Sequence, residues 1–325
     1  MQADGHASVP VETTLRRASS SRVPEAQRGE ALHRALIWLG IALAAGLILY
    51  LTFTGARYYT LSLEERPFSP LHSRLRPSGT VGLRLGFLSL GMFVILFLYP
   101  LRKRSKRWSS IGSTRRWLNF HILFGIATPL VVTFHTSFKC RGLAGLAYWT
   151  MMAVAVSGLV GRYVYAKIPR SLFAVKLTMD ELAAQTADLA SRLEGQNHFR
   201  QSDLAPLLNV PGAAEIRQLS LFGALWIMLC KDLARPFLVS RLRRRGLGGL
   251  QKIATLGGLL PSHHRDLESI VSNARRLSRQ RVSVAFLDRT ERVFHLWHVV
   301  HRPFSFSFVS LLAVHIGVVF SVGFG

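Results

Sequence analysis

Five segments of the chain are each long and apolar enough to cross a lipid bilayer. A helix needs about 20 mostly apolar residues to span the hydrocarbon core. Backbone polar groups have no water partners there, so spanning segments of this kind fold as helices. Charged residues bound each segment, and the five cover residues 35–54, 81–100, 117–137, 143–165 and 300–322. The sequence therefore predicts an all-α, multi-span bundle of about five transmembrane helices.

The charge of the chain points to the same class of protein. The 325 residues are 49% hydrophobic and carry a formal net charge of +24. The basic clusters flank the apolar segments, which is typical of membrane proteins with basic loops, so we expect no nucleic-acid partner. Only two cysteines occur, with no CxxC or CxxCH and no glycine-rich phosphate loop. These features predict no disulfide framework, no covalently attached haem and no built-in nucleotide-binding domain.

The basic loops also predict an orientation. The loop 101–116 holds seven Lys or Arg and no acidic residue, which marks it as cytoplasmic. The N-terminus is then cytoplasmic too. Four parts follow: a polar, basic N-terminal tail, four transmembrane helices, a basic and mostly helical cytoplasmic region, and a last transmembrane helix. They cover residues 1–33, 34–166, 167–292 and 293–325.

One stretch inside the cytoplasmic region is ambiguous. Residues 219–245 contain an uninterrupted apolar core of only about eleven residues, which is short for a span. We expect a helix lying in the membrane interface, with its arginines toward lipid headgroups. Whether this stretch enters the bilayer stays open from the sequence.

Two of the apolar segments carry a matching pair of histidines. His121 and His135 lie fourteen positions apart on the third segment, and His301 and His315 lie fourteen apart on the fifth. At about 100° per residue, fourteen steps end about 40° short of whole turns, so both members of a pair share a face. A rise of about 1.5 Å per residue separates them by about 21 Å. Each pair thus places one imidazole toward each side of the membrane.

Two helices with facing histidines at equal separation can hold two stacked b-type haems, each iron taking two axial imidazoles. The predicted topology pairs His121 with His301 and His135 with His315; if 219–240 spanned the membrane, the partners would exchange. His298 is an alternative to His301, because Pro303 could bend the helix. Two interpretations without haem stay open as well: a metal or proton pathway, or purely structural histidines. Ionisable groups within spans are, however, functional by default.

Other residues fit a supporting role. Arg84, Arg162 and Arg302 lie near segment ends, where arginine could pair with haem propionates, although snorkelling or topology marking would also explain them. Gly125, one turn beyond His121, could leave room for a macrocycle. For Lys167 we expect topology marking, and for most other glycines close helix packing.

Several stretches resemble known membrane cytochromes. The paired H-x13-H helices are similar to the di-haem core of respiratory cytochrome b and of the ferric reductase/NADPH oxidase transmembrane domain. A closer resemblance, to bacterial di-haem cytochrome b-like membrane proteins, is found in the stretches "HTSFK", "SGLVGRYVYAKIPR" and "WHVVHRPF". This resemblance implies His121, His135, His301 and His315 as axial ligands, and a bacterial inner-membrane location. It also implies iron–sulfur or flavin electron carriers as partners.

The predicted function is transmembrane electron transfer through two b haems. Ferric reductases and NADPH oxidases continue into a flavin and nicotinamide domain, and none follows His315 here, so we expect a separate redox partner. The basic region 167–292 could dock an acidic carrier, although basic loops also bind anionic lipid. No catalytic side chains are predicted, so the protein is an oxidoreductase component whose independent turnover stays open. Alternatives are a quinol-oxidising membrane anchor, a histidine-lined metal or proton transporter, and a membrane scaffold or sensor.

Overall fold

The computed structural model describes residues 11–110, 112–168, 201–248 and 255–323, together with the isolated positions 184, 187, 188 and 191. Every regular element within these residues is a helix, which confirms the all-α prediction. The chain divides into two compact units, each described by itself. Unit 1 comprises Met1–Gly158 and Phe304–Gly325, and unit 2 comprises Leu159–Pro303.

Five helices are long and apolar enough to cross a membrane, and they contain the five predicted segments almost entirely. The candidate spans are Gln27–Tyr59, His72–Arg104, Thr114–His135, Gly142–Tyr165 and Leu287–Val322. The helices extend beyond the apolar cores because polar residues keep the helical backbone once it has left the lipid. The helix containing the first span begins at Val11, inside the stretch predicted as a polar tail.

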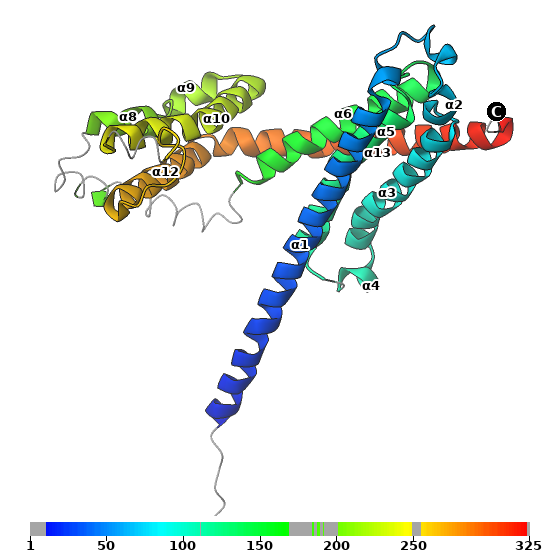
Figure 1. The fold of residues 1–325 in the computed structure, drawn as a ribbon. Helices are drawn as coiled ribbons and strands as arrows, with labels where there is room; N and C mark the ends of the chain where they lie inside the picture. The colour runs from blue at the N-terminus through cyan, green and yellow to red at the C-terminus, as the bar shows by residue number, and fades with distance from the viewer. Residues whose placement is uncertain are drawn as a thin grey trace, which may run out of the picture. The chain divides into compact units, whose positions relative to one another are not determined.

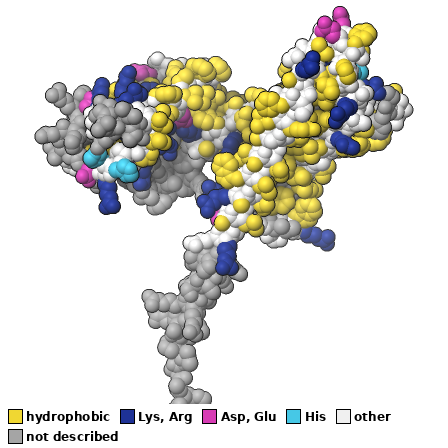
Figure 2. All heavy atoms as spheres, viewed as in Figure 1, with side chains coloured by type: hydrophobic (Ala, Val, Ile, Leu, Met, Phe, Trp, Pro, Cys, Tyr) yellow, Lys and Arg dark blue, Asp and Glu magenta, His cyan; other side chains and the backbone are white. Residues whose placement is uncertain are grey.

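Unit 1 is built from long helices, and those of its N-terminal part lie side by side (Figure 1). It contains α1 (Val11–Tyr59), α3 (Thr80–Arg104), α5 (Thr114–His135), most of α6 (Gly142–Tyr165) and the C-terminal half of α13 (Leu287–Val322). Short helices η1 (Arg66–Phe68), α2 (His72–Leu75) and α4 (Lys106–Ser109) lie in the connections. Figure 2 shows hydrophobic side chains along the outward face of α1, as a lipid-facing helix requires.

Two apolar clusters hold the helices of unit 1 together. The first joins α1, α3 and α5 through Leu51, Leu85, Met92, Ala127, Val131 and Phe134. The second joins α3, α6 and α13 through Phe93, Tyr148, Met151 and Phe308. The rings of Phe93 and Phe308 lie 4.9 Å apart between centroids. These contacts place the last helix of the chain against the helix pair α3 and α5.

A buried arginine fastens the connection after α1 to the end of α5. Arg66 is 5% exposed and donates from its guanidinium to the backbone carbonyls of Leu61, Tyr59 and Ser137. Ser137 has a positive φ of 49° in the turn that ends α5, and its hydroxyl donates to the carbonyl of Leu75. Carbonyl groups at a helix C-terminus lack intrahelical partners, so a buried guanidinium satisfies several at once.

Unit 2 is a smaller helical assembly that includes the end of α6 and the beginning of α13. Its other helices are α8 (Gln201–Leu208), α9 (Ala213–Gln218), α10 (Leu221–Gly246) and α12 (Arg265–Ala285). The amphipathic α12 buries residues at helical spacing, namely Leu267, Ile270, Val271, Ala274, Leu277, Ser278 and Val282. This periodicity makes one face of α12 the core of the unit.

The ambiguous stretch 219–245 forms nearly all of α10, and α10 is not among the candidate spans. The expectation that its arginines point to headgroups is wrong for Arg235 and Arg243, which are both buried. Arg235 pairs with Asp232, and Arg243 binds both carboxylate oxygens of Glu268 at 2.8 Å. Buried guanidinium groups require such partners. Glu268 lies in α12, so a local sequence pattern in α10 could not predict this contact.

Candidate functional site

The two histidines of α5 make the same unusual contact with α3. The Nδ1 of His121 lies 3.0 Å from the carbonyl oxygen of Leu96, and the Nδ1 of His135 lies 2.8 Å from that of Gly82. A carbonyl can only accept, so Nδ1 carries the proton in both rings. Gly82 and Leu96 are themselves fourteen positions apart. The antiparallel helices α3 and α5 therefore repeat one arrangement at two levels.

Leu96 can accept this bond because of a proline one turn later. Its carbonyl would ordinarily pair with the backbone N–H of residue 100, but Pro100 lies inside α3 and has no N–H. The freed carbonyl is the one that His121 uses. The ring of Tyr99 lies beside the His121 imidazole, with 5.1 Å between the centroids. The proline thus creates an acceptor for the histidine within an apolar helix.

At the level of His135, glycines on α3 let the imidazole approach the helix backbone. A Cβ built on Gly86 would lie 2.8 Å from Cε1 and 3.1 Å from Nδ1 of His135, closer than real Cβ atoms approach. A Cβ on Gly82 would collide with the carbonyl oxygen of Arg76. Gly86 lies against α5, as close helix packing requires, whereas Gly82 lies against the chain just before its own helix and a Cβ on Gly91 would meet nothing within 4 Å. The His135 ring therefore lies against bare backbone on α3.

The two hydrogen bonds determine which ring nitrogen of each imidazole is free to bind a ligand. When Nδ1 donates to a carbonyl, the neutral ring presents the lone pair of Nε2. Histidines that bind metals or haem iron are held in this manner, because the bond fixes the tautomer and ring orientation and raises ligand basicity. The residues present thus fit an axial haem ligand at each level of α5.

The structure places the histidines of α13 less completely. His315 lies in unit 1, as His135 does. His301 lies in unit 2, so its predicted pairing with His121 stays a prediction. α13 continues through Pro303 without a break, so the fourteen-residue spacing of its pair is kept on one helix.

His301 and its neighbour His298 have different surroundings within α13. The ring of His301 lies 5.0 Å from that of Trp297 between centroids. His298 contacts the rings of Phe294 and Trp297, and its Nδ1 lies 3.4 Å from the carbonyl oxygen of Phe294 in the preceding turn. Both imidazoles are half-buried, and the choice between them as ligand stays open.

The predicted supporting residues divide into two groups. All three arginines are exposed; Arg84 and Arg162 lie near helix ends, whereas Arg302 lies in the middle of α13. A Cβ on Gly125 would meet only the Leu96 Cδ1 atom, at 3.8 Å, so helix packing does not require glycine there. The spare room beside His121 suits the expected role of leaving space for a macrocycle.

Lys167, for which we expect topology marking, also forms an ion pair within unit 2. Its Nζ lies 2.6 Å from a carboxylate oxygen of Asp232, which also accepts a 2.6 Å hydrogen bond from the Tyr163 hydroxyl. Burial raises the pKa of Asp232, but the bonds from Lys167 and Tyr163 and the charge of Arg235 outweigh burial and leave this pKa lowered. This polar cluster connects the end of α6 to α10.

Sequence reasoning found the histidines of α5 but missed the groups that orient them. Leu96 and Gly82 act through their backbone carbonyls, which lie 25 and 53 positions from the histidines that they orient. One signal was available: Pro100, within an apolar run, marks a free carbonyl four residues earlier. In the described parts of the chain, no three His, Cys, Asp or Glu side chains gather into a metal-binding group, whereas an axial haem site needs only two histidines.

Comparison with known proteins adds no family to this geometry. No family model matches the chain, and neither a curated protein nor a solved structure does.

Proposed function

We propose that this protein is a membrane b-type cytochrome that carries electrons across the bilayer through two bis-histidine haems. The observation that carries the proposal is the repeated Nδ1–carbonyl bond of His121 and His135. Structural histidines have no need of the same orienting bond at two levels fourteen residues apart. Ligands to iron do, because each must present Nε2 in a fixed direction.

The ligand set follows the helix arrangement. His135 and His315 would hold one haem, and both lie in unit 1. His121 and His301 would hold the other, with His298 as the alternative partner. The haems would supply the one-electron chemistry. The residues of the chain would hold the irons, keep water away through the apolar packing of α3 and α5, and offer arginines to propionates.

The membrane, its orientation and the partners are part of the same proposal. The five candidate spans support a multi-pass protein. The basic loop 101–116 favours a cytoplasmic N-terminus, and the resemblance favours a bacterial inner membrane. The electron donor would be a separate iron–sulfur or flavin protein docking on the basic region 167–292. A membrane quinone is the alternative donor.

The test begins with haem and ends with electron transfer. The purified protein should show a reduced-minus-oxidised b-type spectrum with about two haems per chain. Reconstituted into liposomes loaded with ferricyanide, it should speed reduction of the trapped oxidant by an impermeant reductant outside. The matched control is His135→Ala, which should keep one haem and lose the acceleration. A protein without haem after haem-replete expression, or a rate equal to that of empty liposomes despite two haems, would overturn the proposal.

A further inference from the structure

One face of α10 is apolar, exposed and not part of any candidate span. At about 100° per residue, the four residues involved fall within about 60° of one another around the helix. Their side chains are 58–77% exposed, and they are Phe222, Trp226, Leu233 and Phe237. The opposite side of α10 is the buried one, where Ala224, Met228, Arg235 and Val239 pack into unit 2. Packing within unit 2 therefore leaves this stripe uncovered.

A turn next to α10 extends the same apolar surface. The Ser240 hydroxyl, in line with the stripe, donates to the carbonyl of Gly257 at 2.8 Å, which seats the 255–260 turn on the helix. Arg243 also donates to the carbonyls of Gly258 and Leu259. The turn presents three leucines to the outside, Leu256 at 66%, Leu259 at 57% and Leu260 at 48% exposure. Large aliphatic side chains at the tip of a fixed turn are costly in water.

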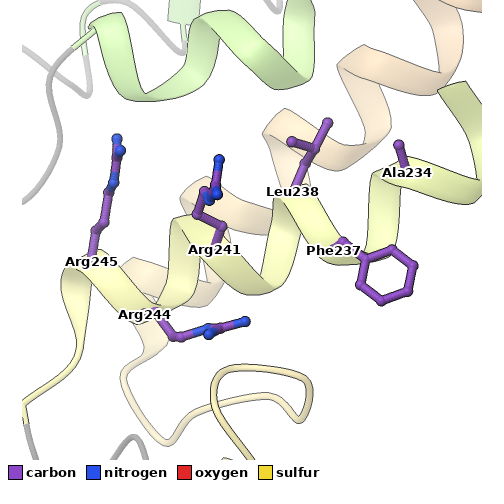
Figure 3. Close-up of a pocket in the computed structure, with 6 residues that line it drawn as sticks. All are labelled: Ala234, Phe237, Leu238, Arg241, Arg244 and Arg245. Atoms are coloured by element: carbon purple, nitrogen blue, oxygen red, sulfur yellow. The ribbon is translucent and has the colours of Figure 1, made fainter.

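Arginines lie at the C-terminal end of the stripe. Figure 3 shows Phe237 and Arg244 extending to one side of α10, and Arg241 and Arg245 to the other. Together with Ala234 and Leu238, these four line a surface hollow of about 670 Å³. Arg245 is paired with Asp203 of α8. Arg241 and Arg244 are exposed, and an exposed guanidinium beside an apolar surface suits a phosphate.

The opposite side of α10 contacts the ends of two candidate spans. Asp232 binds Tyr163 and Lys167 at the end of α6. Met228 lies in contact with Thr290 in the first part of α13, 3.8 Å from hydroxyl oxygen to sulfur. A helix fixed to the ends of spanning helices is at the level of the membrane surface. The uncovered stripe therefore has a bilayer within reach.

We propose that this surface docks into the bilayer that the chain itself crosses, with α10 lying in the plane of the interface. The aromatic stripe and the leucines of the 255–260 turn enter the region between headgroups and acyl chains, and Arg241 and Arg244 bind phosphates of anionic phospholipids. A large apolar face rimmed by arginine is the pattern of an interfacial helix. The assignment is independent of haem, so it stands or fails separately from the proposed electron transfer.

The first experiment measures membrane depth on the full chain in lipid nanodiscs. Nitroxide labels are placed by Phe237→Cys and Leu259→Cys in a Cys140→Ser/Cys230→Ser background, with Ser272→Cys on the outer face of α12 as the control. Labels at 237 and 259 should be relaxed by oxygen and be several-fold less accessible than 272 to a water-soluble nickel chelate. Free access of the chelate to both labels would overturn docking. Shielding from both reagents would also overturn it, since a second copy of the chain would then cover the surface.

The second experiment tests the phosphate contact. Nanodiscs of phosphatidylcholine are compared with nanodiscs that also contain phosphatidylglycerol. The anionic lipid should reduce chelate access to the label at 237 in the parent and in Arg276→Gln/Arg279→Gln, a pair of exposed arginines on α12. Arg241→Gln/Arg244→Gln should lose this reduction while the label stays immersed. An equal response in the two double variants would overturn the assignment of Arg241 and Arg244 to lipid phosphate.

Discussion

The two histidine levels of α5 reach the same geometry by opposite means. At His121, a helix donor is removed: Pro100 has no N–H, so the Leu96 carbonyl is free for the imidazole. At His135, a side chain is removed: Gly86 has no Cβ, so the imidazole reaches the Gly82 carbonyl across bare backbone. The Nδ1 bond is therefore common to the two levels, whereas the residues that permit it differ between them. A variant at one level should therefore leave the other level undisturbed.

The largest effect is expected from Gly86→Val. A Cβ would lie 2.8 Å from the His135 ring, and a branched side chain would displace the imidazole altogether. One of two haems should be lost, with the other unchanged, as measured by haem content per chain and the difference spectrum. Gly91→Val is the matched control on the same helix, where a Cβ meets nothing within 4 Å. Retention of both haems in Gly86→Val would break the proposed role of this level.

Arg66→Ala should come next in size, because it removes the buried guanidinium that binds three carbonyls at or just after the ends of α1 and α5. We expect a loss of about 2 kcal/mol in the free energy of unfolding, since buried acceptors are left unpaired. Chemical denaturation in detergent measures this loss, with the exposed Arg74→Ala as the control. Haem loss should be confined to the His135 level. Equal stability of the two variants would contradict this role of Arg66.

Pro100→Ala should act only at the other level. It restores a backbone N–H that competes with His121 for the Leu96 carbonyl. A weaker Nδ1 bond makes the imidazole a poorer donor to iron, so the midpoint potential of one haem should rise by something on the order of tens of millivolts. A redox titration resolves the two haems, and Leu101→Ala, at an exposed neighbouring position, serves as the control. A shift of both potentials would show that the levels are not independent.

The smallest effect concerns acid stability of unit 2 and should leave both levels untouched. Burial raises the pKa of Glu268, but the hydrogen bonds from Arg243 and Ser262 outweigh burial and hold this pKa below its usual 4.5. A carboxyl with a lowered folded-state pKa contributes stability that is complete above pH 4.5 and is lost as the pH falls through the folded value. Limited proteolysis of unit 2 with an acid-active protease, from pH 7 to well below pH 4.5, should show this loss. Glu268→Gln should flatten the profile, and the exposed Glu291→Gln should keep it.

The sequence was sufficient to predict the features that depend on residues close together in the chain. The five spans follow from runs of apolar residues, and the shared face of His121 and His135 follows from helical periodicity. The contacts that orient the imidazoles could not be predicted, because they join residues 25 and 53 positions apart. The same holds for Arg243, whose burial depends on Glu268 in another helix, and for Lys167, whose partner Asp232 lies far along the chain.

The central claim is that the histidines of α5 are iron ligands held by their Nδ1 bonds. The most direct test counts haem in the parent, in His121→Ala, in His135→Ala and in the double variant, after expression with excess haem. The account predicts about two haems in the parent, one in each single variant with a distinguishable spectrum, and none in the double variant. An unchanged haem content in the double variant, or no haem in the parent, would contradict it.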